Sequence, residues 1–230
     1  LWKSTLELLV MLLLEENYKM FPVTVIDNFF PDPDKVVEMA SNQKFYKTDE
    51  GQWPGERTQE LSHLNQDFFL STALKILGTF YESSVESIDM SMTFQKIKPF
   101  EESRNRGWIH RDNGMQLGGL IYLNQSPEPD TGTNIYEETR GYSLVDREVN
   151  ETKIKHYLGH KVSDEEYQSS YNKMRSQFTE TIKVENRYNR LLLFDGMTYH
   201  GVNTFGKDTE RLTLVFFLKS LFAPIQPLCR

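Results

Sequence analysis

The tripeptide His110-Arg111-Asp112 brings together two side-chain types that bind metal ions. Residues 108–112 are predicted to form a strand, and in a strand the side chains of residues two apart lie on the same face. The imidazole of His110 and the carboxylate of Asp112 therefore point toward one spot, where they can share a metal ion. A His-x-Asp pair is common by chance, and a strand histidine more often makes an ordinary hydrogen bond, so the tripeptide needs support from elsewhere.

A second histidine, His200, occurs near the other end of the chain. The apolar residues 191–194 predict a strand, a turn follows at Asp195-Gly196, and His200 lies in the next predicted strand, residues 199–203. Two histidines and one carboxylate make the facial triad of non-haem Fe(II) oxygenases, which leaves neighbouring coordination positions open for a co-substrate and oxygen. A structural zinc site would instead need a closed tetrahedral shell, usually with cysteines that this chain lacks.

Arg211 lies in a strongly apolar predicted strand, residues 210–219. Alternation along this strand puts one set of side chains, Arg211, Thr213, Val215 and Phe217, on one face, and the other set, Leu212, Leu214, Phe216 and Leu218, on the opposite face. A guanidinium in such a strand needs an anion, because an uncompensated buried charge is very costly. Two partners fit equally well: an internal Asp or Glu in a buried salt bridge, or the carboxylate of a bound molecule, which the planar fork of arginine can hold in a bidentate manner.

In this order and spacing, His110-x-Asp112, His200 and Arg211-x-Thr213 resemble the motifs of the 2-oxoglutarate/Fe(II)-dependent dioxygenase superfamily. The resemblance covers roughly residues 88–219. Residues 91–100, which lead to the metal motif, and the segment GLIYLN at residues 119–124 are similar to the prolyl 4-hydroxylase-like branch. Residues 131–136 correspond to a segment that begins with a pair of glycines in that branch, and here the first glycine is replaced by Thr131.

The resemblance implies a mainly β (α+β) fold, a double-stranded β-helix of the cupin-like jelly-roll type with supporting N-terminal helices. It implies that His110, Asp112 and His200 hold Fe(II) and that Arg211 binds the far carboxylate of 2-oxoglutarate, with Tyr122 and Thr213 as further partners. O2 is then the oxidant, and succinate and CO2 are released as a C–H bond is hydroxylated. Relatives that halogenate have a small residue in place of the aspartate, so Asp112 favours hydroxylation.

The motifs do not identify the substrate. The resemblance indicates first a peptidyl proline or another amino-acid side chain, and second a free amino acid or small metabolite. Candidate specificity elements are the loop at residues 53–57, which contains Arg57, and the insertion at residues 138–180, because long loops on a rigid scaffold commonly carry binding groups. Arg57 suits an anionic substrate group, and it suits an ordinary surface position at least as well. Five basic residues near the metal motif leave the same two alternatives open: Lys96, Lys98, Arg104, Arg106 and Arg111.

A rival hypothesis from a different class is a metal-binding cupin-like isomerase or binding protein without 2-oxoglutarate. Such a protein has the same barrel and a metal, but it has no need of a carboxylate anchor such as Arg211. The two hypotheses therefore differ in the role that they give to this arginine.

Composition and charge describe a globular protein. The chain has 230 residues, of which 38% are hydrophobic and 26% charged, and this predicts one folded domain. The net charge of −7 argues against general nucleic-acid binding. Cys229 is the only cysteine, so an intrachain disulfide is excluded and a reducing cytoplasm is favoured. The apolar run at residues 8–14 is far shorter than the ~20 residues of a membrane helix. We expect a monomer or a homodimer, and this run is the first candidate for a subunit contact.

The predicted elements divide the domain into helical support over residues 1–86 and a β core over residues 87–220 with the 138–180 insertion. Before the core we expect a strand at residues 21–27, a helix opened by Asp32 and Pro33, a surface loop at 43–62 and an amphipathic helix at 67–82. Within the insertion a helix is expected over residues 164–178. Eight short strands that suit a jelly roll are predicted at residues 88–98, 108–112, 115–124, 133–137, 181–185, 190–194, 199–203 and 210–219.

Overall fold

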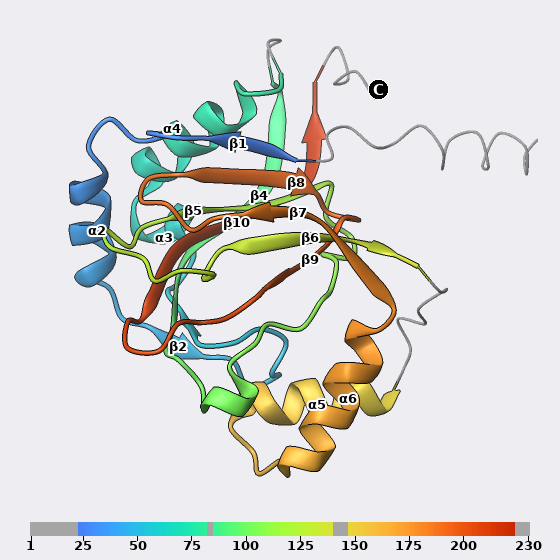
Figure 1. Ribbon diagram of the computed structural model, residues 1–230. Helices are drawn as coiled ribbons and strands as arrows, with labels where there is room; N and C mark the ends of the chain where they lie inside the picture. The colour runs from blue at the N-terminus through green and yellow to red at the C-terminus, as the bar shows by residue number, and fades with distance from the viewer. Residues whose placement is uncertain (1–22, 82–84, 140–146, 224–230) are drawn as a thin grey trace, which may run out of the picture.

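A computed structural model describes residues 23–81, 85–139 and 147–223, which contain two facing antiparallel sheets (Figure 1). The larger sheet has seven strands in the order β1 (Thr24–Ile26), β8 (Leu191–Asp195), β5 (Leu117–Tyr122), β10 (Arg211–Phe222), β4 (Ser87–Ile97), β3 (Glu56–Arg57) and β2 (Tyr46–Lys47). The smaller sheet has the order β7 (Phe178–Val184), β6 (Thr133–Glu138) and β9 (Tyr199–Val202). The predicted double-stranded β-helix is confirmed.

Helices cover the outer face of the larger sheet. They are α2 (Pro33–Ser41), α3 (Leu61–Leu64) and α4 (Gln66–Leu77). The side chain of Asp32 caps α2 by accepting a hydrogen bond from the backbone N–H of Lys35, and Pro33 opens the helix, as predicted. One core cluster joins the buried face of α4 to the even-numbered side chains of β10, including Phe69, Ile76, Leu214 and Phe216. The apolar face of each element is buried against the other, which is the main source of stability for short elements of this kind.

The opposite face of the larger sheet meets the smaller sheet. Leu120, Leu192 and Val215 pack there against Ile135 and Val184 of β6 and β7. The odd-numbered side chains in the first half of β10, from Arg211 to Phe217, therefore point between the two sheets. The strand alternation predicted this division of faces.

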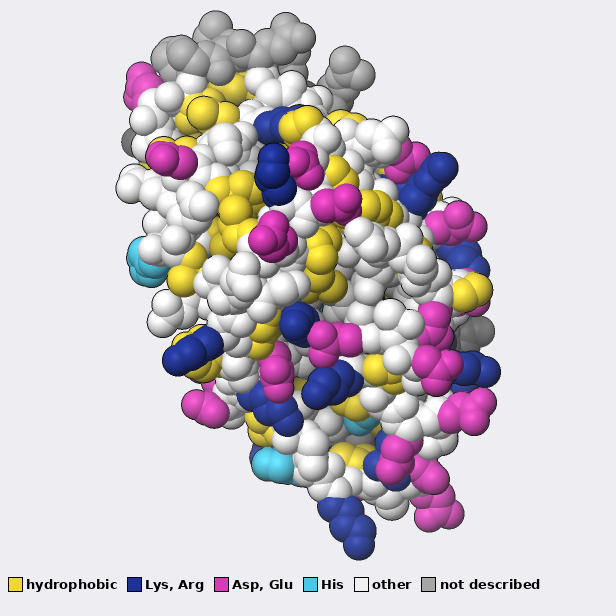
Figure 2. Space-filling view, turned by 90° about the vertical axis from the view of Figure 1, so that its left-hand side faces the viewer, with side chains coloured by type: hydrophobic (Ala, Val, Ile, Leu, Met, Phe, Trp, Pro, Cys, Tyr) yellow, Lys and Arg dark blue, Asp and Glu magenta, His cyan; other side chains and the backbone are white. Residues whose placement is uncertain are grey.

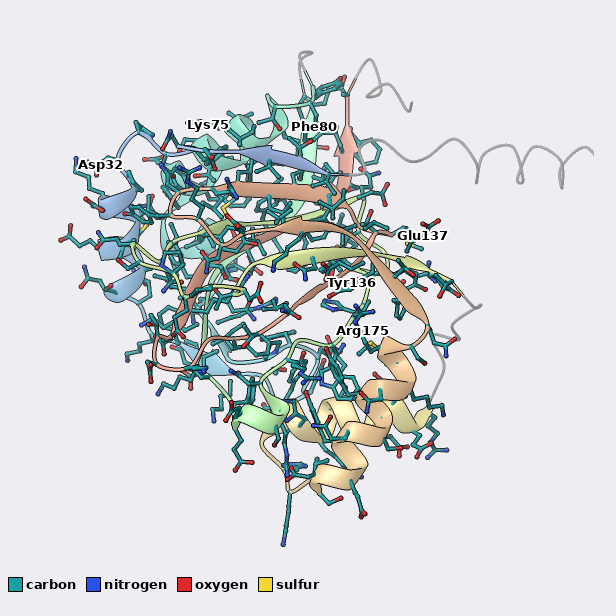
Figure 3. All side chains as sticks on the ribbon, viewed as in Figure 1. Asp32, Lys75, Phe80, Tyr136, Glu137 and Arg175 are labelled. Atoms are coloured by element: carbon teal, nitrogen blue, oxygen red, sulfur yellow. The ribbon has the colours of Figure 1, made fainter. Side chains whose placement is uncertain are left out.

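A second helical layer lies below the smaller sheet in Figure 1 and consists of α5 (Arg147–Leu158) and α6 (Asp164–Arg175), with the short 3-10 turn Glu102–Arg104 beside it. Tyr167 and Met174 of α6 pack with Trp108 and Tyr199 in a separate aromatic cluster. In Figure 3, Arg175 at the end of α6 lies beneath Tyr136 of β6, with its guanidinium carbon 5.1 Å from the ring centroid. These contacts attach the insertion to the barrel.

Seven of the eight predicted core strands are present. The prediction for residues 108–112 is wrong, because His110 forms only an isolated bridge to His200 and its neighbours do not continue the ladder. Residues 43–62 are not simply a surface loop, because β3 pairs with β4 through Arg57↔Gln95 and α3 begins at Leu61. The pairing partner is almost forty residues away in the sequence, so local patterns did not indicate it.

Two predictions about helices were also wrong. The helix α5 was not predicted, because it buries only Val149, Thr152 and His156 and its sequence has little helical periodicity. The helix α4 ends at Leu77 with Gly78 as its C-cap, five residues before the predicted end. The apolar run at residues 8–14 and Cys229 lie outside the described residues. Among the residues that are described, none belongs to a helix that has the length and hydropathy needed to cross a membrane.

Candidate active site

His110, Asp112 and His200 converge at one end of the space between the sheets. His110 and Asp112 precede β5, and His200 lies in β9, joined to His110 by reciprocal backbone hydrogen bonds of 3.0 and 2.8 Å. One ligand atom from each side chain lies within 4.8 Å of the others. The imidazole Nε2 atoms of His110 and His200 are 3.9 and 3.7 Å from the two carboxylate oxygens of Asp112. This spacing fits a single metal ion bound by all three residues.

Backbone carbonyls orient both imidazoles. The Nδ1 atom of His110 lies 2.8 Å from the carbonyl oxygen of Trp108, and that of His200 lies 3.0 Å from the carbonyl oxygen of Thr198. A carbonyl only accepts hydrogen bonds, so each Nδ1 carries the proton and each Nε2 keeps its lone pair for a metal. Burial, with the electrostatic influence of His200, Lys153 and Arg57, holds the pKa of His110 well below the ordinary histidine value. The site therefore favours the neutral imidazole that metal binding requires.

The carboxylate of Asp112 is also available for a ligand. Its Oδ2 atom is buried and has no hydrogen-bond partner among the described residues. Gly118 of β5 leaves the space for it, because a Cβ added at this glycine would lie 2.5 Å from Asp112 Oδ2. An unpartnered buried carboxylate oxygen between two lone pairs is the donor set that a divalent metal completes. Sequence analysis missed Gly118, because its neighbour is brought close only by the folding of the sheet.

Arg211 lies inside the barrel with 3% of its surface exposed. Its Nε donates a hydrogen bond of 3.0 Å to the carbonyl oxygen of Thr131, and its Nη2 has no hydrogen-bond partner among the described residues. Burial lowers the pKa of Arg211. Throughout the described parts of the chain, no carboxylate forms an ion pair with this guanidinium, so the internal salt bridge that the sequence left open is not found there. One edge of the guanidinium remains free for a ligand.

Tyr122 and Thr213 lie next to Arg211 and face each other across β5 and β10. The guanidinium carbon of Arg211 is 5.4 Å from the ring centroid of Tyr122, and the Tyr122 hydroxyl donates a 3.0 Å hydrogen bond to Thr133 Oγ1. The hydroxyl of Thr213 is buried and has no hydrogen-bond partner in the part of the chain that the structure describes. Thr133 lines the cavity, whereas Tyr122 and Thr213 lie behind its wall. Sequence analysis missed Thr133, and direct contact of Tyr122 and Thr213 with 2-oxoglutarate stays a prediction.

A cavity of about 660 Å³ connects these groups, since the three metal-ligand candidates and Arg211 all line it. Apolar side chains make much of the remaining wall, among them Leu120, Phe194, Val215 and Phe217. Both predicted specificity elements reach the cavity: the 53–57 loop through Trp53, Pro54 and Arg57, and the insertion through Val149, Asn150, Lys153, Tyr157 and Met174.

The other histidines and aromatic neighbours have structural positions. His156 is buried and packs on Phe100 at 4.5 Å between ring centroids, and His63 and His160 are exposed. The rings of Trp108 and Tyr199 pack in the aromatic cluster with α6, and Trp108 also lines the cavity. Of the five basic residues near the metal motif, Arg104 pairs with Asp164 at 2.6 Å and Lys96 pairs with Glu210 at 3.5 Å.

Comparisons with known proteins agree with this fold. HygX from Streptomyces hygroscopicus, solved with nickel and 2-oxoglutarate bound, matches with a TM-score of 0.56 at 13% sequence identity, over 90% of this chain and 86% of HygX. HygX with iron bound matches over the same shares with a TM-score of 0.52 and 13% identity. A prolyl-4-hydroxylase from Pseudomonas putida matches with a TM-score of 0.47 and 13% identity, over 86% of this chain and 91% of that one. The search of curated proteins gives no match.

The chain shares its double-stranded β-helix fold with HygX, and the His-Asp-His cluster lies at one end of this barrel. The resemblance inferred from the sequence motifs is thereby confirmed at the level of the fold. A family model described as a family of unknown function, DUF6445, matches residues 13–214, and the chain belongs to this family.

Proposed function

We propose that this protein is an iron(II)- and 2-oxoglutarate-dependent dioxygenase that hydroxylates an unactivated C–H bond of a peptidyl or free amino acid and releases succinate and CO2. The observation that supports it best is that one cavity is lined both by the three convergent ligand atoms and by the unpaired guanidinium of Arg211. A metal site alone would not require a buried arginine without a carboxylate partner. A dicarboxylate that spans the two ends of the cavity supplies that partner.

In this proposal His110, Asp112 and His200 hold the iron through Nε2, a carboxylate oxygen and Nε2. When bound, iron with 2-oxoglutarate and O2 supplies the oxidising chemistry that converts a C–H bond to an alcohol. HygX has been solved once with iron bound and once with nickel and 2-oxoglutarate bound. We propose that this chain likewise binds iron and 2-oxoglutarate.

Arg211 anchors the far carboxylate of 2-oxoglutarate and so positions its other end at the metal. The free Nη2 of Arg211 donates to this carboxylate. Tyr122 and Thr213 lie next to Arg211, and we propose them as further partners of the same carboxylate. The surrounding Leu120, Val215 and Phe217 limit the entry of water, which strengthens these charge-assisted hydrogen bonds.

An amino-acid substrate rests on the resemblance of residues 91–124 to prolyl 4-hydroxylase-like enzymes. We expect one oxygenase domain over residues 1–230, acting as a monomer or a homodimer.

The first test is anaerobic loading of the protein with Fe(II), with and without 2-oxoglutarate, in the wild type, Arg211→Ala and a control, Arg190→Ala. Arg190 pairs with Asp27 away from the cavity. A weak visible absorption band that requires 2-oxoglutarate, persists in Arg190→Ala and weakens in Arg211→Ala is the expected result, and succinate release then serves to screen substrates. Bound iron without such a band would instead favour the metal-binding cupin-like isomerase or binding protein.

A further inference from the structure

Three further cationic side chains line the cavity besides Arg211. Arg57 comes from β3, Arg111 lies between two of the proposed metal ligands, and Lys153 comes from α5. Within the described residues, Asp112 is the one acidic side chain on the cavity wall. The chain as a whole has a net charge of −7, and on the face shown in Figure 2 acidic and basic side chains are intermixed. The positive cavity is therefore a local feature that opposes the overall charge.

Arg57 is held in place by aromatic rings. Its guanidinium carbon lies 4.3 Å from the ring centroid of Trp53 and 5.5 Å from that of Phe217. Its Nε is buried, and over the described ranges no group accepts a hydrogen bond from Nε and no carboxylate forms an ion pair with the guanidinium. The acidic groups whose charge reaches it are Asp112 and Glu60. Arg57 thus has a fixed direction and free donors.

Neither acidic group forms an ion pair with Arg57, and both have other partners or roles. The carboxylate of Glu60 already accepts hydrogen bonds from Ser91 Oγ at 2.6 Å and from the backbone N–H of Met92 at 2.8 Å. The carboxylate of Asp112 belongs to the proposed metal site. Burial lowers the pKa of Arg57 to about 10, as expected for a cation that is desolvated more than it is compensated.

The strand register separates Arg57 from the proposed 2-oxoglutarate site. Arg57 pairs with Gln95 of β4, and Gln95 pairs with Thr213 of β10, so the three side chains form one row on the inner face. Arg57 lies at one end of this row, separated by β4 from the strand that carries Arg211. Gln95 Nε2 donates a 2.9 Å hydrogen bond to the carbonyl oxygen of Pro54, which fixes the loop that carries Trp53. Arg57 is therefore placed for a different ligand group.

Lys153 adds positive charge from the helical side of the cavity. Its Nζ is 5.9 Å from the ring centroid of Tyr157, and among the described side chains it has no ion-pair partner. Burial lowers the pKa of Lys153, and Asp112 is the acidic group whose charge reaches it. Lys155 on the same helix shows the ordinary alternative, since its Nζ pairs with Glu166 of α6 at 3.0 Å. A desolvated lysine without such a partner is unfavourable unless a ligand supplies the anion.

We propose that Arg57 and Lys153 form a second anion-binding site in this cavity, which binds a carboxylate or phosphate group of the molecule that is oxidised. This inference rests on the proposed function, because it takes the pocket beside the metal as the substrate site. The planar guanidinium of Arg57 can hold two oxygens of such a group, Lys153 neutralises it as a point charge, and Arg111 adds to the positive potential. An acidic amino acid or a phosphorylated compound fits this chemistry, and a neutral or cationic substrate does not.

The test measures binding of three small probes to the full chain loaded with Ni(II): phenyl phosphate, phenylacetate and the neutral phenylacetamide. Saturation-transfer NMR titrations are run with and without 2-oxoglutarate on the wild type, Arg57→Met, Lys153→Met and a matched control, Lys161→Met. Lys161 is exposed and does not line the cavity. Calorimetry of 2-oxoglutarate binding and thermal unfolding are measured on the same samples.

At least one anionic probe is expected to bind the wild type and Lys161→Met equally, and phenylacetamide is expected not to bind. Arg57→Met and Lys153→Met should each weaken probe binding by about tenfold or more, because a charge-assisted contact is lost, with unchanged 2-oxoglutarate affinity. Binding of phenylacetate alone identifies a carboxylate substrate, and binding of phenyl phosphate alone identifies a phosphorylated one.

Equal binding of the neutral probe, anion binding that neither variant weakens, or no anion binding at millimolar concentration would each overturn the second site. A parallel loss of 2-oxoglutarate affinity in both variants would also overturn it, because the two cations would then serve the co-substrate. Failure of wild-type protein to bind 2-oxoglutarate would contradict the proposed function instead, and the titrations without 2-oxoglutarate would still test the second site.

Discussion

Replacing Arg211 by methionine should separate stability from co-substrate binding. The change removes the hydrogen bond from Arg211 Nε to the Thr131 carbonyl, and an unsatisfied buried carbonyl costs about 1–3 kcal/mol. It also removes a buried charge without a carboxylate partner, whose desolvation costs several kcal/mol. We therefore expect the free energy of unfolding of ligand-free Arg211→Met to be unchanged or higher, as measured by urea denaturation.

The affinity for 2-oxoglutarate should fall steeply in the same variant. Two hydrogen bonds from the guanidinium to the far carboxylate are worth about 1.5–3 kcal/mol each, which corresponds to about a hundredfold to ten-thousandfold weaker binding. Calorimetric titration of 2-oxoglutarate into Ni(II)-loaded protein measures this. The control Arg190→Met breaks the partly buried pair with Asp27, so it should lose stability and keep the full 2-oxoglutarate affinity.

The opposite pattern would refute the assignment of Arg211. A loss of about 3–5 kcal/mol in the stability of ligand-free Arg211→Met is expected of a broken buried ion pair. If 2-oxoglutarate affinity also stayed at the wild-type value, Arg211 would be a structural residue and not an anchor.

Two further predictions concern the metal site and pH. In Gly118→Ala the new Cβ would displace the Asp112 carboxylate, so calorimetry should show metal affinity reduced by about tenfold or more. The control Gly78→Ala, at the end of α4, should bind metal with the wild-type affinity. Equal metal affinities in the two variants would contradict the role of Gly118. Burial lowers the pKa of His156 to about 4. As pH falls, His156 is therefore protonated in the unfolded chain before it is protonated in the folded one. The free energy of unfolding should fall by up to about 3 kcal/mol as pH drops from 6.5 toward 4. Unfolding measured against pH should show a shallower decline in His156→Phe, and an unchanged slope would exclude His156 as a source of the acid sensitivity.

Much of the core could be predicted because strand alternation is a property of a few consecutive residues. The inward direction of Arg211 and Thr213 followed from the period of two in β10, and the amphipathic spacing of α4 placed Phe69 and Ile76 in the core. The segment around His110 was assigned to a strand, yet it forms a single bridge. Side chains alternate in the same way in a short extended segment whether or not a neighbouring strand pairs with it along its length.

Cavity residues outside the motifs were harder to predict. Lys153 lies on a helix with little amphipathic pattern, and Thr133 gains its position beside Tyr122 only when the two sheets face each other. Arg57 was identified as a candidate for an anionic substrate, but an ordinary surface position was at least as compatible with its sequence. Of its two aromatic neighbours, Trp53 lies in the same loop, but Phe217 comes from β10, which is far away in the chain.

The sequence by itself determined the kinds of side chain that could bind a metal and a carboxylate, their order, and the strand faces on which they lie. These follow from residue chemistry and backbone geometry, which are local. Two facts depend on the fold: no described carboxylate pairs with Arg211, Arg57 or Lys153, and among the described residues Asp112 alone is acidic on the cavity wall. Whether a buried charge has an internal partner depends on which distant segments share its low-dielectric surroundings, and that is a property of the folded chain.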